Sequence, residues 1–401
     1  MRSILLRDAE VYAPESLGVR HVLVSGGRVA WVGSHLPALP RELGVEEVSL
    51  AGRRLIPGFV DGHVHVTGGG GEAGPETRVP PVPLSRFTAG GITTVVGLLG
   101  TDDVTRDIAG LVATVRGLTN EGITALCYTG GYHLPPVTAT GSVRRDMALI
   151  DCVIGVGEVA LSDHRSSQPT LDDLLKVAGD AHVGGLMTGK AGVAHLHLGD
   201  GPRGLDLVRR ALDLGEIPAR VFNPTHVNRK IALFDEALAL AEPGCTIDVT
   251  AFPVAEGDDA LAAGDALLRY LDSGLPPERI TVSSDAGGCL PEFDADGRVA
   301  RFEVGSPGAL ARTLQQLLCT GVALERVLPA FSTNQARLLR LPGKGRIAAG
   351  ADADLAVLTP DGGISDVMAM GQWHVRNGKP VVLGGFEGGD WGLGVRDWES
   401  Q

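Results

Sequence analysis

Residues 55–66 read LIPGFVDGHVHV, and this stretch predicts both a buried strand and a metal site. The apolar run Leu55–Val60 is typical of a parallel strand covered on both faces. Because side chains alternate along a strand, His63 and His65 are expected on one side, at its C-terminal end. Two neutral imidazoles so close together suit a divalent metal ion. Since an HxH pair also arises by chance, the hypothesis depends on further ligands elsewhere in the chain.

The region 57–345 alternates short apolar runs with amphipathic helical patterns. The strand candidates after the first are TTVVGLLG, TALCYTGG, EVALSD, VAHLHLGD, RVFNPTHV, TIDVTAF and ITVSSDAG. Eight such runs with intervening helices predict an α/β fold, a (β/α)8 TIM barrel acting as a metal-dependent hydrolase domain. A doubly wound open sheet is the alternative. The barrel is favoured because no GxGxxG opens the first helix and polar residues recur at the strand ends, where barrel active sites form.

The two chain ends share a different pattern: short runs in which apolar and polar residues alternate. Residues 1–56 and 346–384 each contain a hairpin signal, Gly26-Gly27 and Asn377-Gly378. We expect these ends to pair into one small β-sandwich domain. Residues 385–401 read as a Gly-rich C-terminal tail that is disordered or serves as a subunit arm.

Composition excludes several classes of protein. The chain has 401 residues, 44% hydrophobic and 21% charged, which is typical of a soluble globular protein without a membrane-spanning stretch. A net charge of −13 disfavours nucleic acid and anionic membranes as partners. Five cysteines without CxxC spacing, and acidic residues too early for a signal peptide, predict a cytoplasmic location.

Further candidate metal ligands lie in the predicted strands or at their ends. Together with His63 and His65 they are Glu158 in the fourth strand, His197 and His226 in the fifth and sixth, and Asp285 after the eighth. Four imidazoles and two carboxylates match the ligand preferences of zinc. A bound divalent ion lowers the pKa of its water, and Asp285 would act as general acid and base toward a leaving amine. A single histidine in a strand is more often a packing residue. His195 also forms an HxH with His197, and we favour His197 because it lies nearer the strand end.

Other polar residues cluster at the same predicted strand ends. They are Glu72, Thr101, Tyr132, Arg165 and Arg229, next to the glycines 68–71 that let a backbone approach a ligand. Two arginines and one glutamate complement a substrate with two carboxylates and one ammonium group. An isoaspartyl dipeptide carries these groups.

These motifs resemble the bacterial isoaspartyl (β-aspartyl) dipeptidases of the amidohydrolase superfamily. The resemblance runs from about Val11 to Glu387 and is carried by PGFVDGHVHVTGGGGEAGP, TTVVGLLGTD, TGGYHLP, SDHRS, PTHVNR, TVSSD and GKGRIAAGADADLAVL. It implies a metallo-dependent hydrolase that cleaves the side-chain (isopeptide) amide of β-aspartyl dipeptides. It also implies a homo-oligomer, commonly an octamer.

The resemblance assigns roles residue by residue. His63, His65 and Asp285 would hold one zinc ion, and His197 and His226 the other. A metal-activated hydroxide would attack the amide with Asp285 as acid and base, while Tyr132 polarises the carbonyl. The substrate-binding residues would be Gly70, Glu72, Thr101, Tyr132, Arg165, Arg229 and Cys289.

Two positions depart from the family. The family bridges its metals with a carboxylated lysine, where this chain has Glu158. A glutamate also bridges metals, but its arm is about 3–4 Å shorter, and the additional residue Gly157 predicts a strand bulge that recovers part of this reach. Loss of the second metal is the alternative. At Cys289 the family has serine, and a thiol is a poorer hydrogen-bonding group than a hydroxyl; a nucleophilic role for Cys289 is disfavoured because a metal hydroxide already supplies the nucleophile.

Three alternatives to β-aspartyl dipeptide hydrolysis follow from these residues. The first is a related amidohydrolase acting on another N-acyl or cyclic amide. The second is a preference for β-Asp-Arg or β-Asp-Lys dipeptides from cyanophycin, which needs an acidic pocket that the sequence does not locate. The third is a non-catalytic scaffold, disfavoured because every ligand except the bridging lysine is present.

Overall fold

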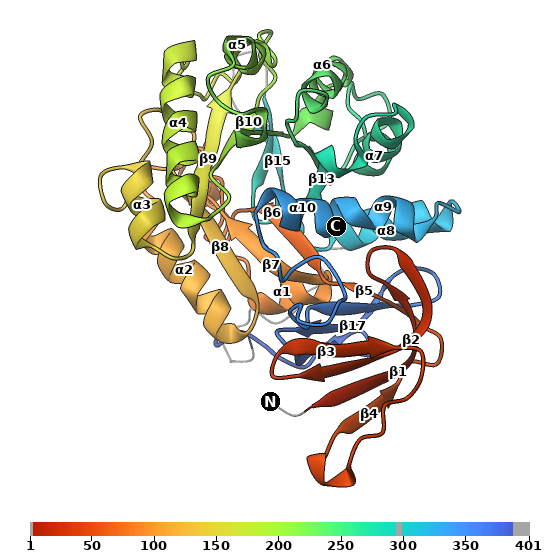
Figure 1. Cartoon of the computed structure of the whole chain (residues 1–401). Coiled ribbons are helices and arrows are strands. Elements are labelled where there is room, and N and C mark those ends of the chain that lie inside the picture. Colours follow the sequence, from red (N-terminus) through yellow and green to blue (C-terminus); the bar gives the residue numbers. More distant parts are fainter. Residues whose placement is uncertain (1–2, 294–298, 388–401) are drawn as a thin grey trace.

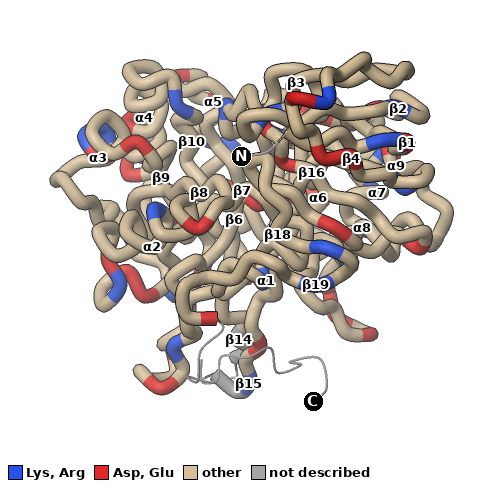
Figure 2. Tube along the Cα trace, turned by 90° about the horizontal axis from the view of Figure 1, so that it is seen from below, with Lys and Arg blue, Asp and Glu red and all other residues tan. Residues whose placement is uncertain are grey.

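The computed structural model describes residues 3–293 and 299–387 of the chain. A barrel lies beside a smaller, strand-rich part (Figure 1). Most of the predicted tail, residues 388–401, lies outside the described residues. Within the described ranges, no helix is long and apolar enough to cross a membrane. Lys and Arg positions lie interspersed with Asp and Glu positions along the chain (Figure 2).

The predicted barrel is confirmed, with eight parallel strands in the described part of the chain. Six of them form one sheet in the order β11-β10-β9-β8-β7-β6, and β12 pairs with β13. Their bounds are β6 (Phe59–Val64), β7 (Ile92–Gly97), β8 (Thr124–Thr129), β9 (Val153–Leu161), β10 (Val193–Leu198), β11 (Phe222–Thr225), β12 (Ile247–Thr250) and β13 (Ile280–Ser283).

Buried side chains join the strands where the backbone ladder is interrupted. Between β11, β12 and β13, Asp248 accepts hydrogen bonds from Thr225 (2.7 Å), Thr281 (2.6 Å) and Ser283 (2.5 Å). Between β13 and β6, the Ser284 hydroxyl donates to Asp61 at 2.5 Å. These bonds satisfy buried polar groups and hold the strand ends that carry the candidate site.

Helices follow the barrel strands and lie outside them (Figure 1). Apolar side chains of the strands and helices form one large core. Among the amphipathic patterns of this region, GLDLVRRALDLG (204–215) contains α5 and KIALFDEALALAEPG (230–244) contains α6. The bounds are α1 (Leu84–Ala89), α2 (Ile108–Glu121), α3 (Val143–Leu149), α4 (Leu171–Thr188), α5 (Asp206–Leu214), α6 (Ile231–Ala241), α7 (Ala263–Asp272), α8 (Ala309–Cys319), α9 (Leu324–Phe331) and α10 (Thr333–Leu338). A hairpin of β14 (Cys289–Phe293) and β15 (Val299–Val304) follows β13.

Both chain ends build the small β-domain, as expected. Its strands hydrogen-bond into one sheet, with the described order β19-β18-β17-β16-β5-β1-β2-β3 and β4 beside β1. Both predicted hairpin turns are present, between β2 and β3 and between β18 and β19. The bounds are β1 (Ile4–Tyr12), β2 (Ser16–Ser25), β3 (Arg28–Gly33), β4 (Glu46–Ser49), β5 (Arg54–Pro57), β16 (Leu355–Leu358), β17 (Ile364–Ala369), β18 (Gln372–Arg376) and β19 (Lys379–Pro380). The exact domain limits stay a prediction.

The stretch LIPGFVDGHVHV forms two strands, not the single one expected from its apolar run. β5 pairs with β1 and β16 in the small sheet, whereas β6 pairs with β7 in the barrel. The chain passes between them at Gly58, where an added Cβ would lie 2.4 Å from Thr93 Oγ1. The run is continuously apolar because both strands are buried, although in different sheets.

Candidate metal centre and active site

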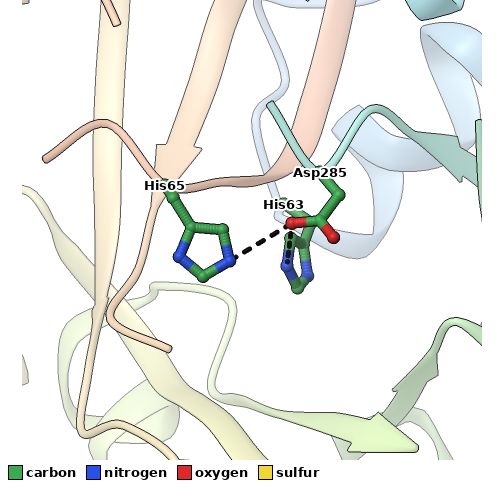
Figure 3. Close-up of side chains that lie close together, drawn as sticks. All are labelled: His63, His65 and Asp285. Atoms are coloured by element: carbon green, nitrogen blue, oxygen red, sulfur yellow. Dashed lines mark ion pairs between the residues drawn. The ribbon is translucent and has the colours of Figure 1, made fainter. Parts of the chain in front are cut away.

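Three candidate ligands meet where β6 and β13 end. Asp285 Oδ1 lies 3.3 Å from His63 Nε2 and 3.2 Å from His65 Nε2 (Figure 3). The two segments are tied together, because Asp61 accepts from the backbone N–H groups of His63 (3.4 Å) and Ser284 (3.2 Å). The backbone N–H of His65 also donates to the Ala286 carbonyl at 2.8 Å. The arrangement could hold a metal ion.

Glu158 reaches the same point from a bulge in β9. The pairing of β9 with β10 shifts between Val156 and Val159, so that β9 carries one more residue than β10 there. This confirms the irregularity predicted at Gly157. A Cβ on Gly157 would lie 2.7 Å from the Cβ of His195, so a residue without a side chain is needed for this close approach.

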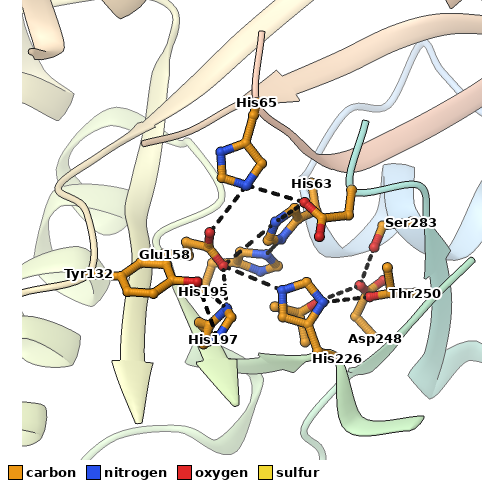
Figure 4. A network of polar contacts seen from close by, with 12 residues as sticks. His63, His65, Tyr132, Glu158, His195, His197, His226, Asp248, Thr250 and Ser283 are labelled. Carbon is orange, nitrogen blue, oxygen red and sulfur yellow. Dashed lines mark hydrogen bonds and ion pairs between the residues drawn. The ribbon is translucent and has the colours of Figure 1, made fainter. Parts of the chain in front are cut away.

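The Glu158 carboxylate lies between the four candidate imidazoles (Figure 4). Its Oε1 is 3.4 Å from His65 Nε2. Its Oε2 is 3.6 Å from His63 Nε2 and 3.5 Å from His226 Nε2, and 3.0 Å from His197 Nδ1. The six predicted ligands therefore converge on one buried point, with Glu158 at its centre.

The donor set fits a divalent metal ion. Charge-assisted hydrogen bonds are about 2.7–2.9 Å long, whereas ligand atoms of a tetrahedral zinc, with bonds near 2.0–2.1 Å, lie about 3.3 Å apart. Most contacts here, at 3.2–3.6 Å, match the second distance. Among the described residues, His63 Nε2 and Asp285 Oδ1 are buried without a hydrogen-bond partner. A cation between them would satisfy both atoms.

His195 does not face this point but supports His63 from behind. Its Nε2 lies 2.8 Å from His63 Nδ1, and its Nδ1 lies 2.6 Å from Asn223 Oδ1. Asn223 donates its amide to the Thr246 carbonyl (2.7 Å), so its oxygen accepts from His195. Burial lowers the pKa of His195 to about 3, and the neutral ring then accepts from His63 Nδ1–H. This order leaves the Nε2 lone pair of His63 facing the centre.

The other two imidazoles have side-chain partners. His226 Nδ1 lies 2.7 Å from Thr250 Oγ1, which leaves Nε2 toward Glu158. Burial lowers the pKa of His226 to about 3, so its ring is neutral. His197 contacts the Tyr132 hydroxyl at 2.9 Å through Nδ1 and Asp163 Oδ2 at 3.1 Å through Nε2.

The carboxylates give the centre a negative character. Burial opposes their ionisation, yet the neighbouring histidines hold the pKa values of Glu158 and Asp285 well below their ordinary range. Burial also opposes a charge on His65, but Asp285 and Glu158 raise its pKa to about 10. Such a site favours a cation, either protons on imidazoles or a metal ion.

A cavity of about 460 Å³ opens above this centre. It is lined by five of the six predicted metal ligands, His63 lying behind them. Every predicted substrate-binding residue also lines it, namely Gly70, Glu72, Thr101, Tyr132, Arg165, Arg229 and Cys289. The structure therefore brings the predicted site residues together.

Opposite charges face each other across this cavity. Arg165 Nη1 lies 3.5 Å from Glu72 Oε1, and the guanidinium stands 5.4 Å from the Tyr132 ring centre. Arg229 contacts Asp200 Oδ1 (3.0 Å) and donates to the Leu198 carbonyl (2.6 Å). The cavity thus offers two guanidinium groups and the Glu72 carboxylate, among other acidic side chains, to a zwitterionic ligand.

The two weakly acidic groups that line the cavity are protonated near neutral pH. Burial raises the pKa of Tyr132 well above its ordinary value, so its hydroxyl keeps a proton to donate. Burial, aided by Glu72, raises the pKa of Cys289 to about 12. A neutral thiol is a poor nucleophile, which supports the sequence-based preference against that role.

Several residues at the site were missed by the sequence. Asp163 was read only as part of SDHRS, although it contacts both His197 and Arg165. Arg106 donates to the carbonyls of Gly69 (2.8 Å), Gly70 (3.4 Å) and Val79 (3.3 Å), and so holds the glycine loop. Further cavity-lining residues are Asp200, Lys230, Phe252, Asp258, Asp259, Leu290 and Glu303. Most of them lie in loops, which carry no periodic signal, whereas Leu290 and Glu303 lie in the hairpin of β14 and β15.

Known proteins resemble this chain over most of its length. Residues 215–374 match the model of the amidohydrolase family. Among curated relatives, an imidazolonepropionase from Anaeromyxobacter sp. (strain K) is 28% identical, covering 84% of this chain and 83% of that protein. A D-hydantoinase from a Thermus species is 17% identical with a TM-score of 0.66, covering 96% of this chain and 97% of its own, and shares the fold.

A solved structure at higher identity defines the family. A β-aspartyl dipeptidase from Fervidobacterium islandicum AW-1, in complex with a β-Asp-Leu dipeptide, is 40% identical with a TM-score of 0.88. The match covers 95% of this chain and 98% of that one. This chain is a hydrolase that belongs to the β-aspartyl (isoaspartyl) dipeptidase family of the amidohydrolases.

Proposed function

We propose that this enzyme hydrolyses the side-chain amide of β-aspartyl dipeptides with the help of one or two divalent metal ions, most simply zinc. The convergence of His63, His65, Glu158, His197, His226 and Asp285 below a cavity lined by Arg165, Arg229 and Glu72 supports this proposal. The 40% identical β-aspartyl dipeptidase supports the same substrate class.

The six converging side chains are the residues that would hold the metal. His63, His65 and Asp285 would form one side, His197 and His226 the other, and Glu158 would bridge them. When bound, a divalent ion would polarise the amide carbonyl and lower the pKa of a water molecule. The alternative is a single ion held by His63, His65 and Asp285. Elemental analysis distinguishes one metal ion per chain from two.

Two side chains would carry out the proton transfer and stabilise the charge that develops on the carbonyl oxygen. Asp285 takes the proton from the attacking water and passes it to the leaving amine nitrogen. Tyr132, protonated at neutral pH, donates to the carbonyl oxygen as negative charge develops there.

The substrate is held by charge and by backbone contact. Arg165 and Arg229 would each bind one carboxylate, and Glu72 would bind the ammonium group. Gly70 and Thr101 would contact the aspartyl unit from the glycine loop and from the loop after β7.

Turnover of β-Asp-Leu by purified enzyme with added zinc tests this function. We expect release of aspartate and leucine, abolished by a chelator and restored by metal. N-Acetyl amino acids and dihydroorotate serve as competing substrates. If metal-replete enzyme fails to cleave β-Asp-Leu but hydrolyses one of these other amides, the proposed function is wrong. The chain is then an amidohydrolase for that other amide.

A dipeptide with Arg or Lys after the β-aspartyl unit is a second candidate substrate. The cavity wall carries the acidic side chains of Asp200, Asp258, Asp259 and Glu303, which complement a cationic side chain. A kcat/KM for β-Asp-Lys at or below that for β-Asp-Leu would argue against this preference. A homo-oligomer, by family resemblance an octamer, stays a prediction that solution mass measurement can test.

A further inference from the structure

One buried carboxylate contacts both a proposed metal ligand and a proposed substrate-binding residue. Asp163 is buried in the loop after β9, and its Oδ2 lies 3.1 Å from His197 Nε2 and 2.8 Å from Arg165 Nη2. Its Oδ1 accepts from the side-chain Nε (3.0 Å) and the backbone N–H (2.7 Å) of Arg165. Asp163 therefore forms a bidentate ion pair with the Arg165 guanidinium. The same carboxylate contacts His197, a proposed metal ligand.

The contact with Asp163 fixes which ring nitrogen of His197 faces the centre. Asp163 Oδ2 is the nearest polar atom to Nε2, at 3.1 Å, and a carboxylate can only accept. The Tyr132 hydroxyl (3.2 Å) and the guanidinium groups of Arg165 (3.5 Å) and Arg229 (3.4 Å) lie farther away. With Nε2 held at Asp163, the other ring nitrogen, Nδ1, faces Glu158 Oε2 at 3.0 Å.

The backbone is built to bring Asp163 this close. Gly199 follows β10 and donates to the Leu161 carbonyl at 3.0 Å. A Cβ at Gly199 would lie 2.4 Å from the Cβ of Asp163, a distance that real side chains do not tolerate. The loops that follow β9 and β10 can thus pack together only with glycine at this position.

We propose that Asp163 is a positioning residue that orients the metal ligand His197 and the substrate-binding Arg165 through one carboxylate. Retention of the metal and binding of the substrate carboxylate then depend on the same side chain. This inference rests on the proposed function and adds a coupling between its two parts.

Asp163→Asn tests the inference, with Asp103→Asn as the matched control. Asn keeps the shape, but loses the charge and offers one oxygen to partners that now use two. Asp103 is also a buried carboxylate at the barrel mouth, but it contacts His133 (2.6 Å) and lies outside the proposed machinery. Zinc retention is measured by competition with a chromophoric chelator, and kcat and KM are measured with β-Asp-Leu.

For Asp163→Asn we expect zinc affinity to fall by roughly 10–100-fold, the usual effect of losing an outer partner of a metal-bound histidine. We expect KM to rise about tenfold or more, because the guanidinium loses a charged partner. Saturating zinc should restore kcat and leave KM high, a separation that a general loss of structure would not produce. The control should change neither quantity.

A change in zinc affinity alone, or in KM alone, overturns the shared role, as does no change in either. If Asp163→Asn fails to fold, Gly199→Ala displaces the carboxylate without removing a polar group and must show the same paired loss; unchanged values there overturn the inference. Zinc competition needs no substrate. Inactivity of the unmodified enzyme toward β-Asp-Leu would therefore refute the proposed function, whereas unaltered zinc retention in the variants refutes this inference.

Discussion

The two sides of the candidate metal centre differ in how closely their ligand atoms are grouped. On one side, His63, His65 and Asp285 come from segments joined by backbone hydrogen bonds and by Asp61. On the other, His197 in β10 and His226 after β11 come from directly paired strands, and both imidazoles also contact side-chain partners, Asp163 and Thr250. Three ligand atoms cluster on the first side, whereas from the second side, within the described residues, His226 joins such a cluster with His63 and Glu158, and His197 joins neither. The first side is therefore the more preorganised for a metal ion.

The largest expected effect concerns Asp285, the proposed ligand on the first side and the proposed acid and base of the reaction. Asp285→Asn should lower kcat by about 10³-fold or more, because general acid–base catalysis alone contributes 10²–10⁴-fold. Kinetics with β-Asp-Leu and elemental analysis measure both roles. Asp213→Asn, on the exposed face of α5, is the control. A variant that keeps a tenth of the activity would remove Asp285 from the mechanism.

Glu158 joins the two sides, so its substitution tests whether they act as one centre. Glu158→Gln keeps the volume but loses the charge that faces four imidazoles. We expect fewer metal ions per chain and a kcat about 10²-fold lower, the equivalent of one charged interaction of about 3 kcal/mol. The surface variant Glu242→Gln should match the unmodified enzyme. Unchanged metal content in Glu158→Gln would mean that the sides bind metal independently.

The relay behind His63 can be compared with the single partner behind His226. Asn223→Ala leaves His195 Nδ1 and the Thr246 carbonyl unpaired, and should lower the free energy of unfolding by about 2 kcal/mol. Zinc affinity should fall roughly tenfold. Thr250→Val removes one contact of His226 and should cost less in both quantities. Urea unfolding of metal-free protein and chelator competition measure them. The reverse order would contradict the greater preorganisation of the first side.

The smallest effect is expected at Cys289, which contributes to neither side. Cys289→Ser should change kcat and KM by only about twofold to threefold. Because burial raises the pKa of this thiol to about 12, alkylation by iodoacetamide at pH 8 should be slow and should accelerate as the pH rises. Mass spectrometry of the labelled protein follows the reaction. Rapid loss of activity at pH 8 through Cys289 would restore its nucleophilic role.

Much of the fold could be read from local patterns. The eight apolar runs became barrel strands, and Gly26-Gly27 and Asn377-Gly378 became hairpin turns with positive φ at both positions. The exception is LIPGFVDGHVHV, where one apolar run serves two sheets. Periodicity reports that residues are buried, but not which neighbours bury them, so the break at Gly58 was not visible.

The site residues also divide into those that local sequence patterns predict and those that only the fold brings together. Those at strand ends, such as His63 and Asp285, were predictable because parallel barrel strands all end at one mouth. Glu158 lies within β9, at its bulge, and was assigned as the expected bridge through the resemblance to the family. The choice between His195 and His197 was made on position, and the structure places His197 at the centre and His195 behind His63. Asp163 was missed because no motif tells which loop carboxylate meets which side chain.

The sequence by itself determined the barrel, the pairing of the two chain ends and the family, because alternation, apolar runs and motifs are local properties. Only the tertiary structure decided how the side chains are shared. It showed that one glutamate lies between four imidazoles, and that one aspartate serves both a histidine and an arginine. The physical reason is that hydrogen-bond order and ligand spacing depend on distances between residues far apart in the chain, and these exist only after folding.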